Sequence, residues 1–184
     1  MTFEPTPIAG LWEIGTAPHR DERGSLTRLF CADAFADLAP GGLRFVQVNH
    51  SITRRRGTIR GLHVQHAPAA EFKLIRCLRG RVFDVAVDLR PGSATFGRWH
   101  AVELSDENQR QILIPPGCAH GFQTLVDGCE LLYQHSAAYR PDCEDGVRHD
   151  DPGLAIAWPE PVADVSARDR GLRSLDALRE GAVA

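Results

Sequence analysis

The 184-residue sequence lacks several features that would assign it to a common class of protein. It has no apolar run near the roughly 20 residues of a membrane-spanning helix. Its first residues have no basic start and include an early Glu and Pro, so we expect no secretory signal. It has no repeat, low-complexity tract or linker, and no GxGxxG fingerprint of a dinucleotide-binding turn. We therefore expect a single cytoplasmic domain over residues 1–184 that does not associate with membranes.

A strong charge imbalance and paired cysteines are also missing. The formal net charge is −3, which provides no general attraction to nucleic acid, so we expect no nucleic-acid partner. A bound polyphosphate would have to be held by arginine and lysine placed locally. The five cysteines are odd in number, widely spaced and without a CxxC pair. We expect them to be reduced and mostly buried.

The middle of the chain has the alternation of short β-strands. Residues 83–89 place Phe83, Val85, Val87 and Leu89 on one face. Glycine and proline are spread along the chain as punctuation, which favours short elements joined by turns. Further strands are predicted over residues 111–114, 119–125 and 130–136.

Helical signals are weak by comparison. A short helix is predicted over residues 33–38, and Ser166 is a typical N-cap for another near the end of the chain. Many short strands with few helices indicate a mainly β fold, and we expect a cupin-like jelly-roll barrel. Such a barrel can hold a ligand between its sheets.

Polar side chains gather where a simple β-sandwich would place apolar ones. Residues 47–66 mix strand formers with His, Arg, Asn and Gln, and Lys73 follows. A second cluster spans residues 118–123, and Tyr133 and His135 share one face of a predicted strand. These segments are the candidates for a functional site.

The motif Arg60-Gly61-Leu62-His63 matches the RGLH signature of dTDP-4-dehydrorhamnose 3,5-epimerases, and the chain resembles that family nearly throughout. One such motif would be weak evidence, but the matches follow the family's order. The resemblance implies a cupin-like homodimer that uses no metal or other cofactor. It also implies a nucleotide-sugar substrate, a 4-keto-6-deoxy sugar epimerised at carbon 3, carbon 5 or both. The other matching segments are 47–49, 83–85, 92–99, 119–122, Tyr133 with Tyr139, 151–152, 156–159 and 166–169.

The resemblance further implies a role for individual residues. His63 is similar to the base that removes a proton from the sugar, and Asp169 to the carboxylate that orients this base. Tyr133 is similar to the acid that returns a proton on the opposite face, and Lys73 to the residue that stabilises the enolate. The remaining pocket and substrate-contact residues implied by the resemblance are Arg23, Gln47, Asn49, Arg60, His120, Tyr139, Glu144 and Arg170.

Elementary chemistry independently supports these roles. A proton beside a ketone is weakly acidic, and histidine, with a pKa of about 6.5, is unprotonated yet basic near neutral pH. A carboxylate on the second ring nitrogen fixes the tautomer and stabilises the imidazolium. A lysine cation stabilises the charge that develops on the carbonyl oxygen. Tyrosine, with a pKa of about 10, arrives protonated and can supply the returning proton.

The sequence departs from the family near its start. Family members commonly read D-x-R-G-x-F-x-E, whereas this chain has Leu26 in place of the Phe and Arg28 in place of the Glu. In the family these positions reach the nucleotide base from the neighbouring subunit. We therefore expect Leu26 and Arg28 to alter nucleotide specificity.

Two other functions compete with epimerisation. His63, His66, Glu71 and His120 have the side chains of a metal-dependent cupin oxygenase or isomerase, although the usual H-x-H spacing is replaced by H-x-x-H. A non-catalytic sugar-binding cupin is the third possibility, because a fold alone does not determine function. A binding module, however, has no use for an acid and a base.

Structural roles compete with the catalytic ones. Tyr133 would serve as a core aromatic, Lys73 as a charge on an edge strand, and Asp169 as an acidic residue in the first turn of a helix. Arg60 and His63 would point to opposite faces of a regular strand, so both can enter one pocket only if Gly61 marks a bulge. We also expect an exposed loop at residues 54–56 and surface positions for the histidines at 19, 100 and 149.

Overall fold

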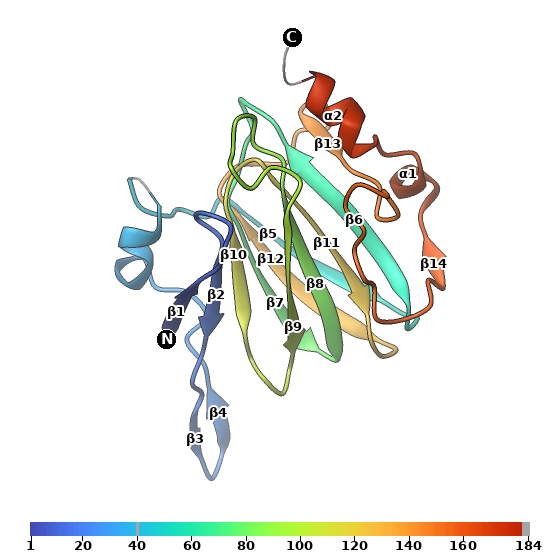
Figure 1. Ribbon diagram of the computed structural model, residues 1–184. Coiled ribbons are helices and arrows are strands. Elements are labelled where there is room, and N and C mark those ends of the chain that lie inside the picture. Colours follow the sequence, from blue (N-terminus) through green and yellow to red (C-terminus); the bar gives the residue numbers. More distant parts are fainter. Residues whose placement is uncertain (40, 182–184) are drawn as a thin grey trace.

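The computed structural model describes residues 1–39 and 41–181, and two facing β-sheets dominate it (Figure 1). The first sheet contains β1 (Thr2–Pro5), β2 (Trp12–Gly15), β10 (Gln111–Ile114), β7 (Lys73–Arg79), β12 (Cys129–His135) and β5 (Gln47–Thr53), in that spatial order. The second contains β13 (Glu144–Gly146), β6 (Thr58–Gln65), β11 (Cys118–Thr124), β8 (Arg81–Asp88) and β9 (Trp99–Ser105). The short β14 (Asp164–Val165) adds to β6 in parallel.

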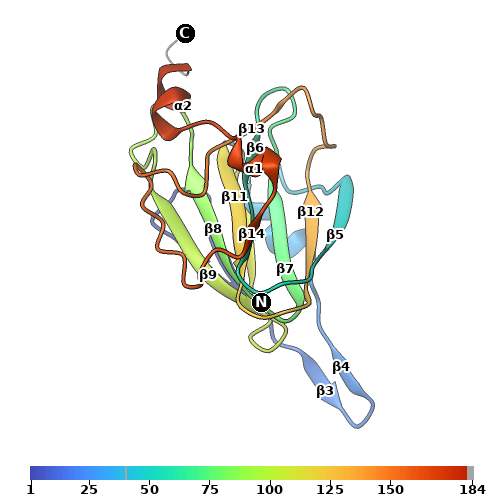
Figure 2. The same ribbon diagram turned by 90° about the vertical axis from the view of Figure 1, so that its right-hand side faces the viewer.

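The remaining elements lie outside the two sheets. β3 (His19–Asp21) and β4 (Gly24–Leu26) form a hairpin that projects away from the barrel (Figures 1 and 2). The helices are the 3-10 helix η1 (Asp33–Leu38), α1 (Ala167–Arg170) and α2 (Leu175–Gly181). Among the described residues, no helix is long and apolar enough to cross a membrane. The structure confirms the predicted mainly β barrel with few short helices.

Three apolar clusters hold the sheets in place. The central cluster lies between the sheets and includes Ile75 of β7, Ala86 of β8 and Phe122 of β11. A second cluster covers the outer face of the second sheet with the C-terminal segment, and a third covers part of the first sheet with η1. Because apolar residues pack on both sides of the sheets, strands such as β8 are buried on both faces.

The predicted strands are confirmed, with end shifts of one or two residues. Residues 111–114 form β10, and the strands predicted at 83–89, 119–125 and 130–136 are β8, β11 and β12. The odd-numbered face of β8 packs into the second cluster as the alternation indicates. The helix predicted at 33–38 is η1, and Ser166 caps α1 by accepting the Asp169 N–H. The hairpin β3–β4 and α2 had no counterpart among the predictions.

The predictions for isolated side chains were mostly right. The five cysteines are free, and Cys31 alone of them is not buried. Residues 54–56 form an exposed loop, and His19 is exposed. His100 is half-buried against Glu13. The prediction for His149 was wrong: it is buried, and its backbone carbonyl accepts the indole N–H of Trp158.

Candidate active site

A cavity of about 910 Å³ opens between the two sheets, where β5 of the first sheet faces β6 of the second. Side chains from β5, β6, β7, β11, β12 and β13 line it, together with the segment that leads into α1. In Figure 2, β5 and β12 lie to the right of β6, β14 and α1. The volume is suited to a ligand of nucleotide-sugar size.

A β-bulge at Gly61 brings two predicted residues into this pocket. His63 is opposite His120 of β11 and Arg60 is opposite Phe122, so β6 has one residue more than its partner over this stretch. Gly61 has a φ of +114°, and a Cβ there would lie 2.6 Å from the Gly121 Cα atom. Arg60 and His63 both line the pocket as a result, which confirms that Gly61 marks the predicted irregularity.

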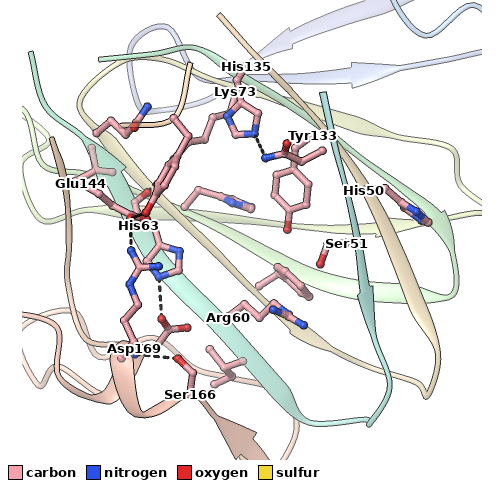
Figure 3. A pocket seen from close by; sticks show the side chains of 18 of the residues that line it. His50, Ser51, Arg60, His63, Lys73, Tyr133, His135, Glu144, Ser166 and Asp169 are labelled. Carbon is pink, nitrogen blue, oxygen red and sulfur yellow. Dashed lines mark hydrogen bonds and ion pairs between the residues drawn. The ribbon is translucent and has the colours of Figure 1, made fainter. Parts of the chain in front are cut away.

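His63 is held by a buried carboxylate from the far end of the chain. Its Nε2 atom lies 2.8 Å from Asp169 Oδ1 (Figure 3). The Gly61 N–H donates to Asp169 Oδ2 at 2.9 Å. Ser166, the N-cap of α1, accepts the Asp169 N–H and fixes the start of this helix. Since Nε2 is engaged, Nδ1 is the ring nitrogen of His63 that remains for chemistry.

The environment of Asp169 favours its ionised form. Burial by itself would favour the neutral acid, but the hydrogen bonds with His63 and the Gly61 N–H outweigh it and lower the pKa of Asp169. An ionised carboxylate stabilises the His63 imidazolium once the ring has taken a proton. The pair therefore has the geometry of an oriented general base.

Tyr133 faces the pocket from the opposite sheet. Its ring packs edge-on against His120 at 5.8 Å and parallel to His135 at 6.1 Å. Burial, and then the nearby Asp84 carboxylate, raise the pKa of Tyr133 well above its usual value. Figure 3 shows His63 and Tyr133 on opposite sides of the pocket. Tyr133 is therefore a protonated group facing the base across the cavity.

His120 forms a second, more deeply buried histidine–carboxylate pair. Its Nε2 atom lies 2.9 Å from Asp84 Oδ2, and the Asp84 side chain is completely inaccessible to solvent. The second oxygen of Asp84 has no hydrogen-bond partner among the described residues. Asp84 thus fixes the His120 ring, which packs edge-on against Tyr133.

Lys73 is the only lysine of the chain, and it points into the same cavity (Figure 3). Its Nζ atom donates to the His63 carbonyl at 3.0 Å and lies 3.5 Å from Glu71 Oε1. Burial lowers the pKa of Lys73, while the Glu71 carboxylate opposes this effect. The Lys73 amino group is therefore largely desolvated, and it lies beside the base with the Glu71 carboxylate as its nearest acidic neighbour.

The rim of the pocket is polar and contains two arginines. Arg60 donates to the Thr53 hydroxyl at 3.0 Å and to a backbone carbonyl of β5. Glu144 accepts hydrogen bonds from the Tyr139 hydroxyl at 2.6 Å and from Arg168. The arginines are the local cations that a phosphorylated ligand would need.

The structure brings together most of the predicted site residues. The predicted residues that line the cavity are Asn49, Arg60, His63, Lys73, His120, Tyr133, Tyr139, Glu144 and Asp169. Gln47 lies just outside, where its side chain contacts Asn49 and the Tyr139 N–H. Arg23 is exposed on the β3–β4 hairpin and pairs with Asp21. Leu26 and Arg28 line a separate hollow of about 620 Å³ near the N-terminus.

Arg170 is the predicted substrate contact that needs correction. Arg168, not Arg170, is the arginine of α1 that lines the cavity, and Arg170 is exposed elsewhere. Residues two positions apart in an α-helix are separated by about 200° around its axis, so the side chains of Arg168 and Arg170 leave the helix on opposite sides. Only the docking of α1 through Ser166 and Asp169 decides which of them faces the pocket.

Two residues that contact the predicted site were not predicted from the sequence as part of it. Glu71, which is buried, and His135, which is partly buried, form a pair beside Lys73, with His135 Nδ1 3.0 Å from Glu71 Oε2. The signal for His135 was present, because it lies two residues after Tyr133 on the same strand face. The sequence suggests Glu71 only as a candidate metal ligand.

The alternative set of metal ligands is not brought together. His63 pairs with Asp169, His120 pairs with Asp84, and His66 is exposed beside Asp145. Within residues 1–39 and 41–181, no group of three or more suitable side chains is arranged to hold a metal ion. The histidines instead have carboxylate partners, which suits proton transfer.

Comparison with known proteins decides the family. The family model of dTDP-4-dehydrorhamnose 3,5-epimerases matches residues 5–177. The chain belongs to this epimerase family. The predicted resemblance is thereby confirmed, and the protein is an enzyme of the isomerase class.

Similar members of the epimerase family differ in the number of centres that their names specify. A dTDP-4-dehydrorhamnose 3-epimerase of Streptomyces niveus is 38% identical over 180 residues, which are 98% of this chain and 86% of the relative. A 3,5-epimerase of Methanothermobacter thermautotrophicus is 42% identical over 178 residues, 94% of each chain. The solved structure of the Legionella pneumophila 3,5-epimerase with dTDP-4-keto-L-rhamnose has a TM-score of 0.91 and 39% identity, and the match covers 98% of this chain and 96% of that one.

Proposed function

We propose that this epimerase inverts carbon 3, carbon 5 or both of a nucleotide-linked 4-keto-6-deoxy sugar, with His63 as the base. One observation carries the proposal. His63, oriented by a buried carboxylate, and the protonated Tyr133 face each other across one cavity, with the Lys73 cation beside them. Inversion of a carbon atom requires a base and an acid on opposite faces of the sugar, and this arrangement supplies both.

The base acts through the free nitrogen of His63. Nε2 is held by Asp169, so Nδ1 takes the proton from the carbon next to the keto group. The imidazolium that results is stabilised by the ionised Asp169, as in other histidine–carboxylate pairs. Both neighbours of carbon 4 are activated by the same ketone, so one base can serve both positions.

The negative charge that develops on the ketone oxygen is stabilised by Lys73. A cation already in place contributes most in the transition state, because no solvent has to reorganise. Tyr133 then returns a proton from the opposite face, and its raised pKa keeps it protonated at neutral pH. No redox step is required, because the proton that leaves is replaced by another.

The diphosphate of the substrate would be held by the cations at the rim. Arg60 and Arg168 line the cavity, and guanidinium groups suit phosphate through paired hydrogen bonds. Asn49, Tyr139 and Glu144 are the polar groups available to the sugar. We propose Arg168 for the role that the sequence assigned to Arg170.

We further propose that the enzyme is a cytoplasmic homodimer. Val46, Val48 and Ile52 are exposed on and beside the edge strand β5, where an uncovered apolar surface favours association. Leu26 is the most exposed large apolar side chain of the projecting hairpin. A second copy would cover the β5 surface, and the hairpins with Arg23, Leu26 and Arg28 would then approach the partner's nucleotide.

The two competing functions have less support. A metal-dependent cupin needs a ligand set, and the candidate side chains are occupied by carboxylate partners or point away from one another. A sugar-binding module needs no oriented base, whereas His63 is held by Asp169, which is itself fixed by hydrogen bonds with the Gly61 N–H and the Ser166 hydroxyl. Proton transfer explains this arrangement and binding alone does not.

The test is solvent exchange at the sugar. The enzyme is incubated with dTDP-4-keto-6-deoxyglucose in heavy water, and NMR locates deuterium at carbon 3 and carbon 5. We expect incorporation by the wild-type protein and its loss in His63→Asn, with the circular dichroism spectrum unchanged. Exchange by His63→Asn at the wild-type rate would exclude His63 as the base.

A matched control separates chemistry from general damage. His66 lies immediately after β6, is exposed, and pairs with Asp145 at 3.5 Å outside the cavity. His66→Asn should therefore exchange like the wild type. If both variants lose activity equally, the loss comes from the fold of this segment and not from the base.

A further inference from the structure

Glu71 and His135 form a largely buried ionisable pair that the proposed mechanism does not use. The Glu71 side chain is 5% exposed and that of His135 is 12% exposed. Glu71 has two neighbours: its Oε2 atom lies 3.0 Å from His135 Nδ1, and its Oε1 atom lies 3.5 Å from Lys73 Nζ. A buried carboxylate is costly unless it is paired, and these two contacts provide the pairing.

The hydrogen bonds around His135 determine which nitrogen carries its proton. Asn49 Nδ2 lies 3.4 Å from His135 Nε2, and the Asn49 carbonyl oxygen accepts from Gln47. An amide nitrogen donates, so Nε2 accepts and the proton of the neutral ring is on Nδ1. Nδ1–H then donates to Glu71. The chain of contacts leaves the other oxygen of Glu71, Oε1, as an acceptor facing Lys73.

Lys73 depends on this acceptor in two ways. An ammonium group has three N–H donors, of which one goes to the His63 carbonyl and one points to Glu71. The third remains for the pocket. Moreover, burial alone would favour the neutral amine, and Glu71 is the carboxylate within 4 Å of Nζ among the described residues.

The other titratable groups around Lys73 are weaker partners. Glu144 on β13 and Cys118 on β11 act on it only at longer range. Glu144 is moreover engaged with Tyr139 and Arg168. His63 on β6 contributes its carbonyl oxygen, and the Tyr133 ring on β12 packs parallel to His135. Glu71 is thus the counter-charge of Lys73.

We propose that Glu71 and His135 are positioning residues, through which the enzyme keeps Lys73 charged and aimed at the ketone oxygen of its substrate. The proposal rests on the function proposed above, since only an enolate needs this cation. His135 acts through Glu71, because it touches the carboxylate and not the ammonium group. The His135 ring also packs parallel to the ring of Tyr133, the proposed acid, so His135 contacts both Tyr133 and the carboxylate that pairs with Lys73.

The experiment uses the fact that Lys73 is the only lysine. Protein labelled with 13C-lysine gives one side-chain Cε signal, whose shift with pH reports the ionisation of Lys73 directly. In Glu71→Gln, which keeps the shape and removes the charge, we expect the titration midpoint of Lys73 to fall by about one pH unit or more. The alkaline limb of the solvent-exchange rate should move by the same amount. If the midpoint is unchanged, the inference is overturned.

Glu13 offers a closely matched control. Its carboxylate also joins a histidine and a cation, His100 at 2.8 Å and Arg110 at 3.1 Å, but it lies outside the cavity. Glu13→Gln should leave both the Lys73 midpoint and the exchange profile unchanged. Glu71→Asp, which retains the charge, should restore the midpoint toward the wild-type value. It also provides a test if Glu71→Gln folds poorly.

A double-mutant cycle tests His135. His135→Leu should alter the titration midpoint of Lys73 in the wild-type background. It should have no effect in Glu71→Gln, because residue 71 then has no carboxylate charge through which His135 could act on Lys73. Independent, additive effects would overturn the role assigned to His135. If Glu71→Gln lowers the midpoint while the exchange profile stays in place, Lys73 has no part in the chemistry. In that case the proposed mechanism fails, whereas Glu71 remains the counter-charge.

Discussion

Replacing Asp169 by asparagine tests the hydrogen bonds around the base with almost no change in volume. The two carboxylate oxygens accept from two different donors, His63 Nε2–H and the Gly61 N–H. An amide has one acceptor and one donor end, so it can satisfy only one of them. In either orientation of the amide, the Asp169→Asn variant pays a definite cost.

The two orientations have different consequences. If the amide oxygen faces His63, the buried Gly61 N–H is unpaired, which costs about 1–3 kcal/mol. For a chain of this length, that corresponds to a fall in Tm of about 2–12 °C. If the amide nitrogen faces His63, Nε2 must accept, and the ring proton moves to Nδ1. The base is then blocked, and we expect solvent exchange to fall by about 10²-fold or more.

Thermal unfolding and deuterium incorporation are measured on Asp169→Asn and on a control, Asp151→Asn. Asp151 is also buried and accepts two backbone N–H groups, from Gly153 at 2.9 Å and from Leu175 at 3.1 Å. It should lose a similar amount of stability and keep the exchange rate. Wild-type Tm together with wild-type exchange in Asp169→Asn would refute the reasoning.

The pKa of Asp169 adds a dependence on pH. This pKa is lowered in the folded protein, so the ionised group contributes stability above its unfolded pKa of about 3.9. The contribution is lost as the pH falls through the folded-state pKa. The difference in unfolding free energy between wild type and Asp169→Asn should therefore shrink in acid, which denaturant titrations at several pH values will measure.

Three further outcomes are expected. Tyr133→Phe should retain part of the proton abstraction, as measured by deuterium exchange. It should form at least about 10²-fold less inverted product, as measured by NMR, and unchanged turnover would exclude Tyr133 as the acid. Gly61→Ala should unfold at a lower denaturant concentration, because its Cβ would lie 2.6 Å from the Gly121 Cα atom at a φ of +114°; an unchanged midpoint would mean that the bulge tolerates a side chain. Leu26→Phe with Arg28→Glu should shift nucleotide preference toward dTDP in calorimetric titrations with dTDP, UDP, CDP and GDP, since the wild type lacks an aromatic surface for the base. A tenfold wild-type preference for dTDP (about 1.4 kcal/mol) that the double change does not increase would locate base recognition elsewhere.

Local patterns predicted the elements that local interactions stabilise. β8 was recognisable from its alternating apolar residues, and β10 from its short run of consecutive apolar residues. Ser166 was recognisable because an N-cap needs only a side chain and the next turn. The hairpin β3–β4 is exposed throughout and has Leu26 as its single large apolar residue, so it lacks such a pattern. Helix α2 is too short for its two buried leucines to indicate a period.

Errors arose where burial depends on distant segments. His149 is surrounded by charged neighbours in the sequence, which indicated the surface, yet it is buried in the loop that precedes Trp158. Arg168 and Arg170 are both arginines of one short helix, so the sequence does not show which of them faces the cavity. Only the contact of α1 with β6 directs Arg168 into it. In a helix of a single turn, contacts with other elements decide which side chain faces the cavity.

By itself, the sequence determined the residue types, the strand alternation, the glycine that permits a bulge and the order of motifs that identifies the family. Only the tertiary structure decided which groups act together. His63 and Asp169 are 106 residues apart, and they meet because β14 adds to β6 and directs α1 onto it. Likewise Glu71 and Lys73 meet His135 across a strand pair. The pKa values follow from burial and from such pairs, and both depend on contacts between residues that are distant in the chain.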